Sequence, residues 1–424
     1  MNSRHAPCFS LQNGLAVLLF HAMRILMLCR SMPWHLAGGL EHHAWDLARG
    51  LANAGDEVHI LTTPAHPARP APEPPPRVHL HALAHGKPGR YGMGAFAAFA
   101  RAAAALDRQF DFDVIHAQGF AANAFPRALA PKLAITVHGT LTSETELYPP
   151  LFEQLAPGQK LLSLWRHKAR LASAPLFRHA LRMASVLLVD SDFTRRELES
   201  SYSDLQPKIR VVPLGIHPDR MPIVVKASSP KASSRPAETN ASPHSLRLLS
   251  ISRLTRSKGL HIALEAASLL QGNWHWEIAG TGPEEKALRQ MHRQLNLGGR
   301  VELLGGVEES DLQTLRAESH CFVFPELGYP AFGLVALEAM LAGLPVVASD
   351  HGAIPEVVRP DCGWTIPDLN PQSLASILQR LIQEPSCLAP IAATCRHRAL
   401  ERFSFDSMIS QTRKALGECE LRHA

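Results

Sequence analysis

The stretch from residue 320 to residue 350 constrains the fold more than any other part of the chain. An apolar run is followed by a loop rich in proline and glycine, by an apolar segment that stops at Gly343, and by a second apolar run. Short apolar runs between turn residues predict buried strands, and the segment from about residue 332 to 341 predicts a helix. These elements predict a βαβ unit of a parallel sheet, whose ligands bind at the carboxyl ends of the strands.

Two residues of this unit are candidates for ligand binding. Glu338 lies inside the predicted apolar helix, where a carboxylate is costly unless something pairs with it, and a sugar hydroxyl is one such partner. Gly333 leaves backbone N–H groups open at the start of the helix, which suits a phosphate. The alternative is a core helix with one solvated glutamate, and these two residues alone do not decide between the interpretations.

Length and composition limit the class of protein. A chain of 424 residues, 46% of them hydrophobic, is long enough for two ordinary domains, and a net charge of +5 does not indicate nucleic-acid binding. The seven cysteines are an odd number without a CxxC pair, which argues against a disulfide framework and a zinc site and favours a reducing compartment. The sequence contains no run of eighteen apolar residues, so it predicts no membrane span. We therefore expect a cytoplasmic protein.

Alternating predicted strands and helices divide the chain into two α/β halves. Residues 1–22 are expected to be a disordered leader rather than a secretion signal, because no good cleavage site follows their short apolar run. One domain is predicted over 23–222 and a second over 246–400, with the Ser-, Ala- and Pro-rich segment 223–245 as a flexible linker. A helix over 401–424 ends the chain and could cross back to the first domain.

Predicted strand ends in the first half carry further candidates. Gly38 and Gly39 stand where the first strand turns into a helix, and their backbone can approach an anion, although a simple tight turn also explains the pair. His138 follows another strand, at the edge where ligands of parallel sheets bind; the alternative is a histidine merely hydrogen-bonded in a loop. The pattern GxGxxG is absent, so a nicotinamide-type site is not predicted.

Two cations follow the first predicted strand of the second half. Arg253 offers a planar fork and Lys258 a point charge, a combination that suits a diphosphate. Because two α/β halves joined by a linker leave a cleft between them, that cleft is the default ligand site.

The segment 159–183 contains no acidic residue and interleaves basic with apolar side chains. This pattern predicts amphipathic helices that lie on an anionic membrane surface or receive an anionic acceptor. A helical insertion with a solvated basic face is the alternative.

Eight segments taken together resemble a known family. The chain is similar to the retaining glycosyltransferases of the GT-B fold, family four, the glycosyl transferases group 1, and the resemblance covers about residues 23 to 405. It implies two Rossmann-like parallel-sheet α/β domains that face a deep cleft. Each segment is moderately specific, and their order and spacing are highly specific. The segments are MRILMLCRSMPWHLAGGLEHHAWDLARGLANAGDEVHILT, ITVHGT, VLLVDSDFTRREL, VVPLGIHPDRM, ISRLTRSKGLHIALEA, IAGTGPEE, VELLGGV and AFGLVALEAMLAGLPVVAS.

The resemblance also implies a function. A hexose would pass from a nucleotide-diphosphate sugar to a hydroxyl of a glycan or lipid-linked acceptor, with retention, in cell-envelope polysaccharide biosynthesis. The protein would work in the cytoplasm or on the cytoplasmic membrane face, without a metal or another cofactor. Arg253 and Lys258 would neutralise the leaving diphosphate, and His138 would lie beside the donor sugar. The implied donor-binding residues are Gly38, Gly39, Gly333, Leu334, Val335 and Glu338.

One position departs from the family pattern E-x-F-G-x-x-x-x-E. Pro330 stands where the first glutamate is expected, and Glu326, four residues earlier, could replace it as a donor-binding residue if the loop were remodelled. Losing one charge-assisted hydrogen bond costs about 1.5–3 kcal/mol, which an enzyme survives, so we expect an enzyme. The rival is a degenerate glycosyltransferase-like binding or scaffold subunit without turnover. A sugar-nucleotide epimerase would need acid and base carboxylates that the sequence does not place.

Overall fold

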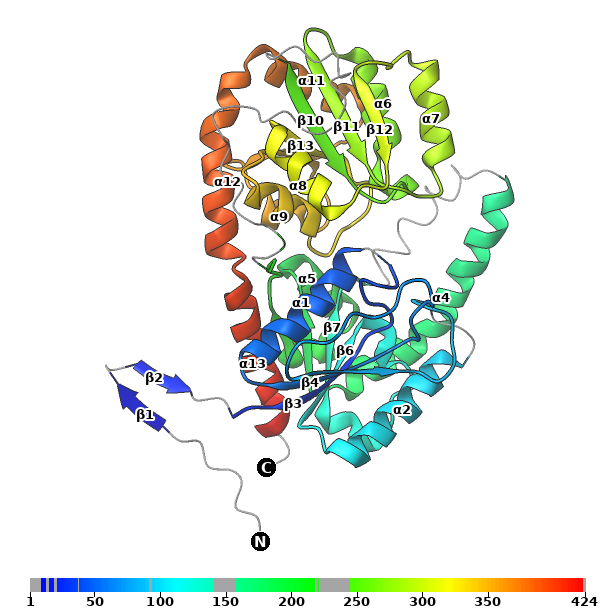
Figure 1. Ribbon diagram of the computed structural model, residues 1–424, viewed down its shortest axis with the longest axis vertical. Helices are drawn as coiled ribbons and strands as arrows, with labels where there is room; N and C mark the ends of the chain where they lie inside the picture. Colours follow the sequence, from blue (N-terminus) through cyan, green and yellow to red (C-terminus); the bar gives the residue numbers. More distant parts are fainter. Residues whose placement is uncertain are drawn as a thin grey trace.

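Two parallel sheets, each flanked by helices, lie one above the other along the long axis of the molecule (Figure 1). The computed structural model describes residues 9–12, 15–18, 21–36, 38–90, 94–140, 157–217, 220 and 245–421. The predicted linker 223–245 therefore lies outside the described residues except for its last one. The predicted fold class, two Rossmann-like α/β domains, is confirmed.

The first sheet contains seven strands in the order β5-β4-β3-β6-β7-β8-β9. All its pairings are parallel, and its interior strands are mostly apolar and buried because helices cover both faces. The strand order reverses between β3 and β6, which is where ligands of such sheets bind. The strands are β3 Arg24–Leu28, β4 Glu57–Thr62, β5 Val78–Ala82, β6 Val114–Gln118, β7 Leu133–Val137, β8 Val186–Val189 and β9 Ile209–Val211.

The second sheet repeats this order of connection with six parallel strands, β12-β11-β10-β13-β14-β15. Its order reverses between β10 and β13, so the loops after these two strands are the equivalent ligand-binding loops. The strands are β10 Leu246–Ile251, β11 Trp274–Ala279, β12 Val301–Gly305, β13 Cys321–Phe324, β14 Val346–Ser349 and β15 Gly363–Ile366.

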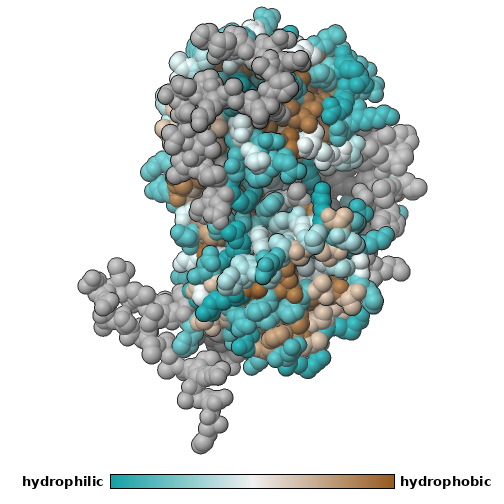
Figure 2. All heavy atoms as spheres, viewed as in Figure 1, coloured by the Kyte–Doolittle hydropathy of each residue, from teal (hydrophilic) through white to brown (hydrophobic). Residues whose placement is uncertain are grey.

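Helices cover both sheets and complete the cores. The face shown in Figure 2 has small apolar patches among hydrophilic residues, which fits a protein whose apolar side chains are mostly buried. The helices of the first domain are α1 Gly39–Asn53, α2 Ala95–Phe110, α4 Pro157–Met183 and α5 Asp192–Ser201. The remaining helices are α6 Leu260–Leu269, α7 Glu285–Gln294, α8 Glu309–Glu318, α9 Leu334–Leu341, α10 Ile354–Val357, α11 Pro371–Gln383, α12 Leu388–Arg402 and α13 Phe405–Leu421.

The basic segment predicted as amphipathic helices is a single helix, α4, with Pro175 inside it. Near its C-terminal end, Phe177 and Leu181 are buried in the core of the first domain. Leu171 and Leu176 are exposed to 45% and 43%. The helix therefore combines an anchored end with apolar side chains that face solvent.

The C-terminal helix α13 lies against the first domain, although the preceding helix α12 packs on α9 of the second (Figure 1). It contacts α1 and the strands β6, β7 and β8. Gly50 of α1 permits the close approach, since a Cβ atom there would lie 2.3 Å from Cδ1 of Ile409. The guanidinium of Arg413 donates to both carboxylate oxygens of the fully buried Asp56, at 2.8 and 2.9 Å.

Within residues 1–22, which we expected to be a disordered leader, the structure describes two short strands, β1 Phe9–Gln12 and β2 Leu15–Leu18, paired as an antiparallel hairpin. Among the helices of the described residues, none has the length and apolar character needed to cross a membrane.

Candidate functional site

Two helix N-termini from different domains face each other. α1 begins at Gly39 after β3, and α9 begins at Leu334 after β13. A Cβ atom on Gly39 would lie 3.2 Å from Cδ1 of Leu334, so the helix starts are in contact. The first N–H groups of a helix, which include those of Leu334 and Val335 here, have no partner within it, and both dipoles present their positive ends. This arrangement suits an anionic ligand.

Different structural constraints require glycine at the two positions that precede these helices. Gly333 has a φ of 98°, a left-handed conformation that side chains rarely adopt. Gly38 is extended, but a Cβ atom there would lie 2.4 Å from Oε2 of Glu41, a buried carboxylate in the first turn of α1. At either position a side chain would meet backbone strain or a close contact beside the start of the helix.

The carboxylate of Glu338 is buried and bound by two arginines. Arg316 of α8 donates to one oxygen at 2.8 Å, and Arg220, from the end of the first domain, donates to the other at 2.7 Å. Arg220 also lies 3.5 Å from Asp46 of α1, and Arg316 donates to Glu309. The partner that the sequence required for Glu338 is thus a charge network across the domain interface, and no sugar hydroxyl is needed to satisfy it.

Lys258 and Glu326 form an ion pair at the carboxyl end of the second sheet. Glu326 is buried, and its other oxygen accepts from the N–H of Gly328 at 3.2 Å, so both oxygens have protein partners. The ammonium of Lys258 lies 5.6 Å from the ring centre of Phe324, and the Cβ position of Gly333 lies 3.9 Å from the same ring. Lys258 and the start of α9 therefore flank one phenylalanine.

Arg253 follows β10 and is exposed. No hydrogen bond or ion pair joins its guanidinium to another residue within the described parts of the chain. The structure thus puts Gly39 in contact with Leu334 and places the Lys258–Glu326 pair on the other side of Phe324 from the start of α9, whereas it leaves Arg253 exposed.

His138 lies in a polar network at the carboxyl ends of β6, β7 and β8. Its Nδ1 is 2.8 Å from Oδ2 of Asp190, and its Nε2 is 2.7 Å from Oε1 of Gln118. The ring of His43 from α1 packs edge-on against it at 5.4 Å. Because both ring nitrogens have partners, the structure holds His138 in one orientation.

The neighbouring His116 makes the stability of the fold depend on pH. Complete burial, together with the charge of His138, lowers the pKa of His116 from 6.5 to about 3. Between these values the unfolded chain binds a proton that the folded protein excludes, so stability falls as the pH falls. We expect His116 to lower the free energy of unfolding by about 2 kcal/mol when the pH falls from 7 to 5. Denaturant titrations of the protein and of His116→Gln at both pH values test this; an equal pH dependence in the variant would contradict it.

The loop that contains Pro330 also touches the first domain. The ring of Tyr329 stacks on Phe193 of α5, with centroids 6.3 Å apart. Nearby, Glu356 of α10 accepts the backbone N–H groups of Asp192 and Phe193 at 2.9 and 2.6 Å, and so caps α5 from the other domain. These contacts close one side of the interface without a carboxylate at position 330.

A cavity of about 520 Å³ opens in the first domain. Its walls come from the loops after β3, β4 and β5, the same edge of the sheet as Gly38. It carries cationic and imidazole side chains, one indole and no carboxylate. The lining residues are Trp34, His35, His66, Ala68, Arg69, Lys87, Pro88 and Arg90.

Sequence reasoning missed the partners of the predicted residues. Arg316 follows the buried Leu315 and lies four residues after Leu312, which packs against the core, so helical spacing could have indicated that it faces inward. No comparable signal existed for Arg220, Gln118 or Asp190, because their partners are distant in the chain.

Both halves match known protein families. Residues 37–220 match the model described as Glycosyltransferase Family 4, and residues 234–399 match the model described as Glycosyl transferases group 1. The chain has the two domains of a GT-B glycosyltransferase.

A curated glycosyltransferase is among the relatives of this chain. The chain is 31% identical over 209 residues to the amylovoran biosynthesis glycosyltransferase AmsK of Erwinia amylovora, covering 46% of the chain and 47% of AmsK. The chain thus spans about half the length of this curated relative.

Solved structures show the same fold. Sucrose-phosphate synthase of Thermosynechococcus elongatus has a TM-score of 0.74 at 21% identity, covering 92% of this chain and 98% of that one. Anabaena HepE, in complex with UDP and glucose, has a TM-score of 0.65 at 20% identity, covering 93% and 99%.

Proposed function

We propose that this GT-B protein transfers a hexose from a nucleotide-diphosphate sugar to a hydroxyl group of a glycan or lipid-linked acceptor, with retention and without a metal ion. The observation that carries the proposal is the contact between the N-termini of α1 and α9, one from each domain. The donor diphosphate would lie against these two positive helix ends. The complex of HepE with UDP and glucose supports a donor of this class.

Charge stabilisation of the leaving group is the main catalytic contribution of this site. Arg253 and Lys258 would neutralise the diphosphate as the bond between it and the sugar breaks. A phosphate oxygen would take the acceptor proton on the same face of the sugar, which gives retention without a covalent enzyme intermediate. His138, held by Asp190 and Gln118, would orient the donor sugar. A ribose hydroxyl would replace Arg220 on one oxygen of Glu338.

A panel of nucleotide sugars with UDP, GDP and ADP as leaving groups tests the proposal. Release of free nucleoside diphosphate is measured for each donor, and the anomeric configuration of the product is read by NMR. We expect release with a subset of donors and a retained configuration. An inverted product would contradict the mechanism.

The rival function, a binding or scaffold subunit, rests on Pro330 and predicts a different result. Such a protein would bind a nucleotide sugar in calorimetry but release no diphosphate from any donor. The pairing of Glu326 with Lys258 leaves no described carboxylate of this loop free to replace the missing one. The panel therefore separates the two functions.

The cationic cavity of the first domain would receive the acceptor, which we propose to be anionic. Arg69, Lys87 and Arg90 line it without a carboxylate, on the sheet edge that also carries Gly38. Removing two charge-assisted contacts in Arg69→Ala with Arg90→Ala is expected to raise the KM for a phosphate-bearing acceptor at least about tenfold. The KM for the donor should change little. Equal KM values for phosphorylated and neutral forms of one acceptor would contradict the anionic assignment.

Attachment to the cytoplasmic face of the membrane through residues 159–183 stays a prediction. The described part of α4 is compatible with it, because Lys168 and Leu171 are exposed on the same helix.

A further inference from the structure

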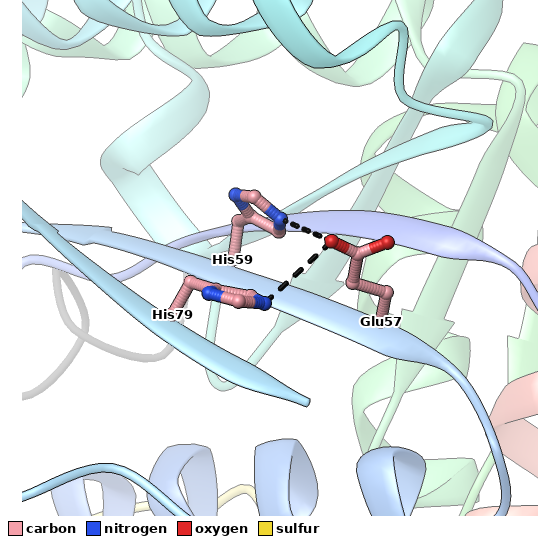
Figure 3. A group of neighbouring side chains, drawn as sticks. All are labelled: Glu57, His59 and His79. Atoms are coloured by element: carbon pink, nitrogen blue, oxygen red, sulfur yellow. Dashed lines mark hydrogen bonds and ion pairs between the residues drawn. The ribbon is translucent and has the colours of Figure 1, made fainter. Parts of the chain in front are cut away.

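A second group of polar side chains lies on two neighbouring strands of the first sheet, the edge strand β5 and the adjacent β4. Glu57 and His59 lie two residues apart on β4, and His79 and His81 lie two residues apart on the edge strand β5. Residues two apart share one face of a strand. Because His59 pairs in register with His79, the two strands bring imidazoles and a carboxylate together (Figure 3).

The geometry of three of these side chains fits a metal ion. One ligand atom from each of Glu57, His59 and His79 lies within 4.8 Å of the other two. Oε1 of Glu57 is 3.2 Å from Nε2 of His59 and 3.6 Å from Nε2 of His79. Bonds of about 2.0–2.1 Å to a tetrahedral Zn²⁺ place ligands roughly 3.3 Å apart, so little movement is needed.

Neighbouring residues hydrogen-bond to the proposed ligands and orient them, as residues around known metal sites do. Nδ1 of His59 lies 2.9 Å from Nε2 of His81, so it can donate its proton there and leave Nε2 free for the ion. Arg24 donates to the other oxygen of Glu57 at 3.2 Å.

The surroundings leave one side open. The rings of Phe110 and Phe112 pack against His59 at 4.5 and 5.0 Å. The side chain of His79 is 49% exposed, which gives an ion a path of entry and a water molecule a fourth position.

We propose that Glu57, His59 and His79 bind a divalent transition-metal ion of the Zn²⁺ class. The ion would connect the edge strand β5 to β4. It would take no part in glycosyl transfer, since Glu57 is the first residue of β4 and the proposed donor site lies at the carboxyl ends of the strands. A second group, His275, Glu277 and Glu302, is less suited to an ion of this class because it offers one imidazole and two carboxylates.

The test uses the full-length, tag-free protein after removal of metal by a chelator. Zn²⁺ is titrated by calorimetry, and Co²⁺ is added as a spectroscopic probe of tetrahedral coordination. We expect one equivalent to bind and to raise the unfolding temperature. His79→Asn and Glu57→Gln each remove a ligand and should weaken Zn²⁺ binding by more than about a hundredfold. His81→Asn removes the hydrogen-bond partner of His59 and should weaken Zn²⁺ binding by about ten- to a hundredfold.

The matched control is His397→Asn. His397 is an exposed histidine, 3.7 Å from Glu401 on the same helix, and removing it should leave Zn²⁺ binding unchanged. Failure of the wild-type protein to bind one equivalent would overturn the proposal. So would undiminished binding by His79→Asn and Glu57→Gln, or loss of binding in His275→Asn alone.

Discussion

Replacing Arg253 and Lys258 together by alanine is expected to slow the release of nucleoside diphosphate by at least about a thousandfold. The reason is electrostatic, because charge grows on the leaving diphosphate as the sugar departs, and two cations fixed beside it stabilise that charge. The exposed position of Arg253, without a described partner, leaves it available for a ligand. The measurement is the initial rate with a donor that the panel has identified.

Two controls separate catalysis from folding. Alanine at Lys258 leaves the buried Glu326 without its cation, so Lys258→Ala is combined with Glu326→Gln, which removes the stranded charge. This variant should fold and remain slow. Lys286→Ala with Arg359→Ala removes two exposed cations of the same domain and should keep the wild-type rate. An unchanged rate in the Arg253 and Lys258 double variant would remove the proposed site.

Replacing Asp56 by alanine is expected to destabilise the first domain by about 3 kcal/mol. Asp56 is fully buried and accepts two hydrogen bonds from Arg413 of α13 and one from the N–H of Met23 at 3.1 Å. The substitution leaves these donors without their acceptor. In thermal unfolding we expect the midpoint of the first domain to fall by about 6–12 °C.

An exposed ion pair serves as the control that separates the effect of burial from the loss of an ion pair. Arg182 and Asp204 form the same kind of pair on the surface, with about half of each side chain exposed. Asp204→Ala should therefore cost far less than Asp56→Ala. Removing both buried charges, in Asp56→Leu with Arg413→Met, should restore much of the lost stability. Equal midpoints for Asp56→Ala and Asp204→Ala would refute the argument.

The local pattern of the sequence was enough to predict the fold and the starts of the helices that form the site. The apolar runs matched the strands, and glycines marked the starts of α1 and α9 within one or two residues. These features depend on periodicity and on backbone conformation, both of which a single sequence displays. The segment that forms the single helix α4 was predicted as more than one amphipathic helix. In the structure the helix continues through Pro175, and Phe177 and Leu181 beyond it are buried in the core.

Side-chain partners could not be predicted in the same way. Glu338 was expected to need a partner, but Arg220 lies 118 residues away and in the other domain. Glu326 was expected to bind the donor if its loop were remodelled, but its pairing with Lys258 was not predicted. Such pairs depend on the relative positions of distant elements. The alternating residues Glu57, His59, His79 and His81 were readable, yet only the register of β4 and β5 shows that they meet.

The return of α13 to the first domain means that the polypeptide passes between the domains twice. Met408, Ile409 and Leu416 of this helix are buried in the same core as Leu47 and Leu51 of α1. A protein fragment that ends before residue 223 would lack these side chains and would expose the apolar surface of α1 that they cover. We therefore expect that the first domain cannot be isolated by simple truncation.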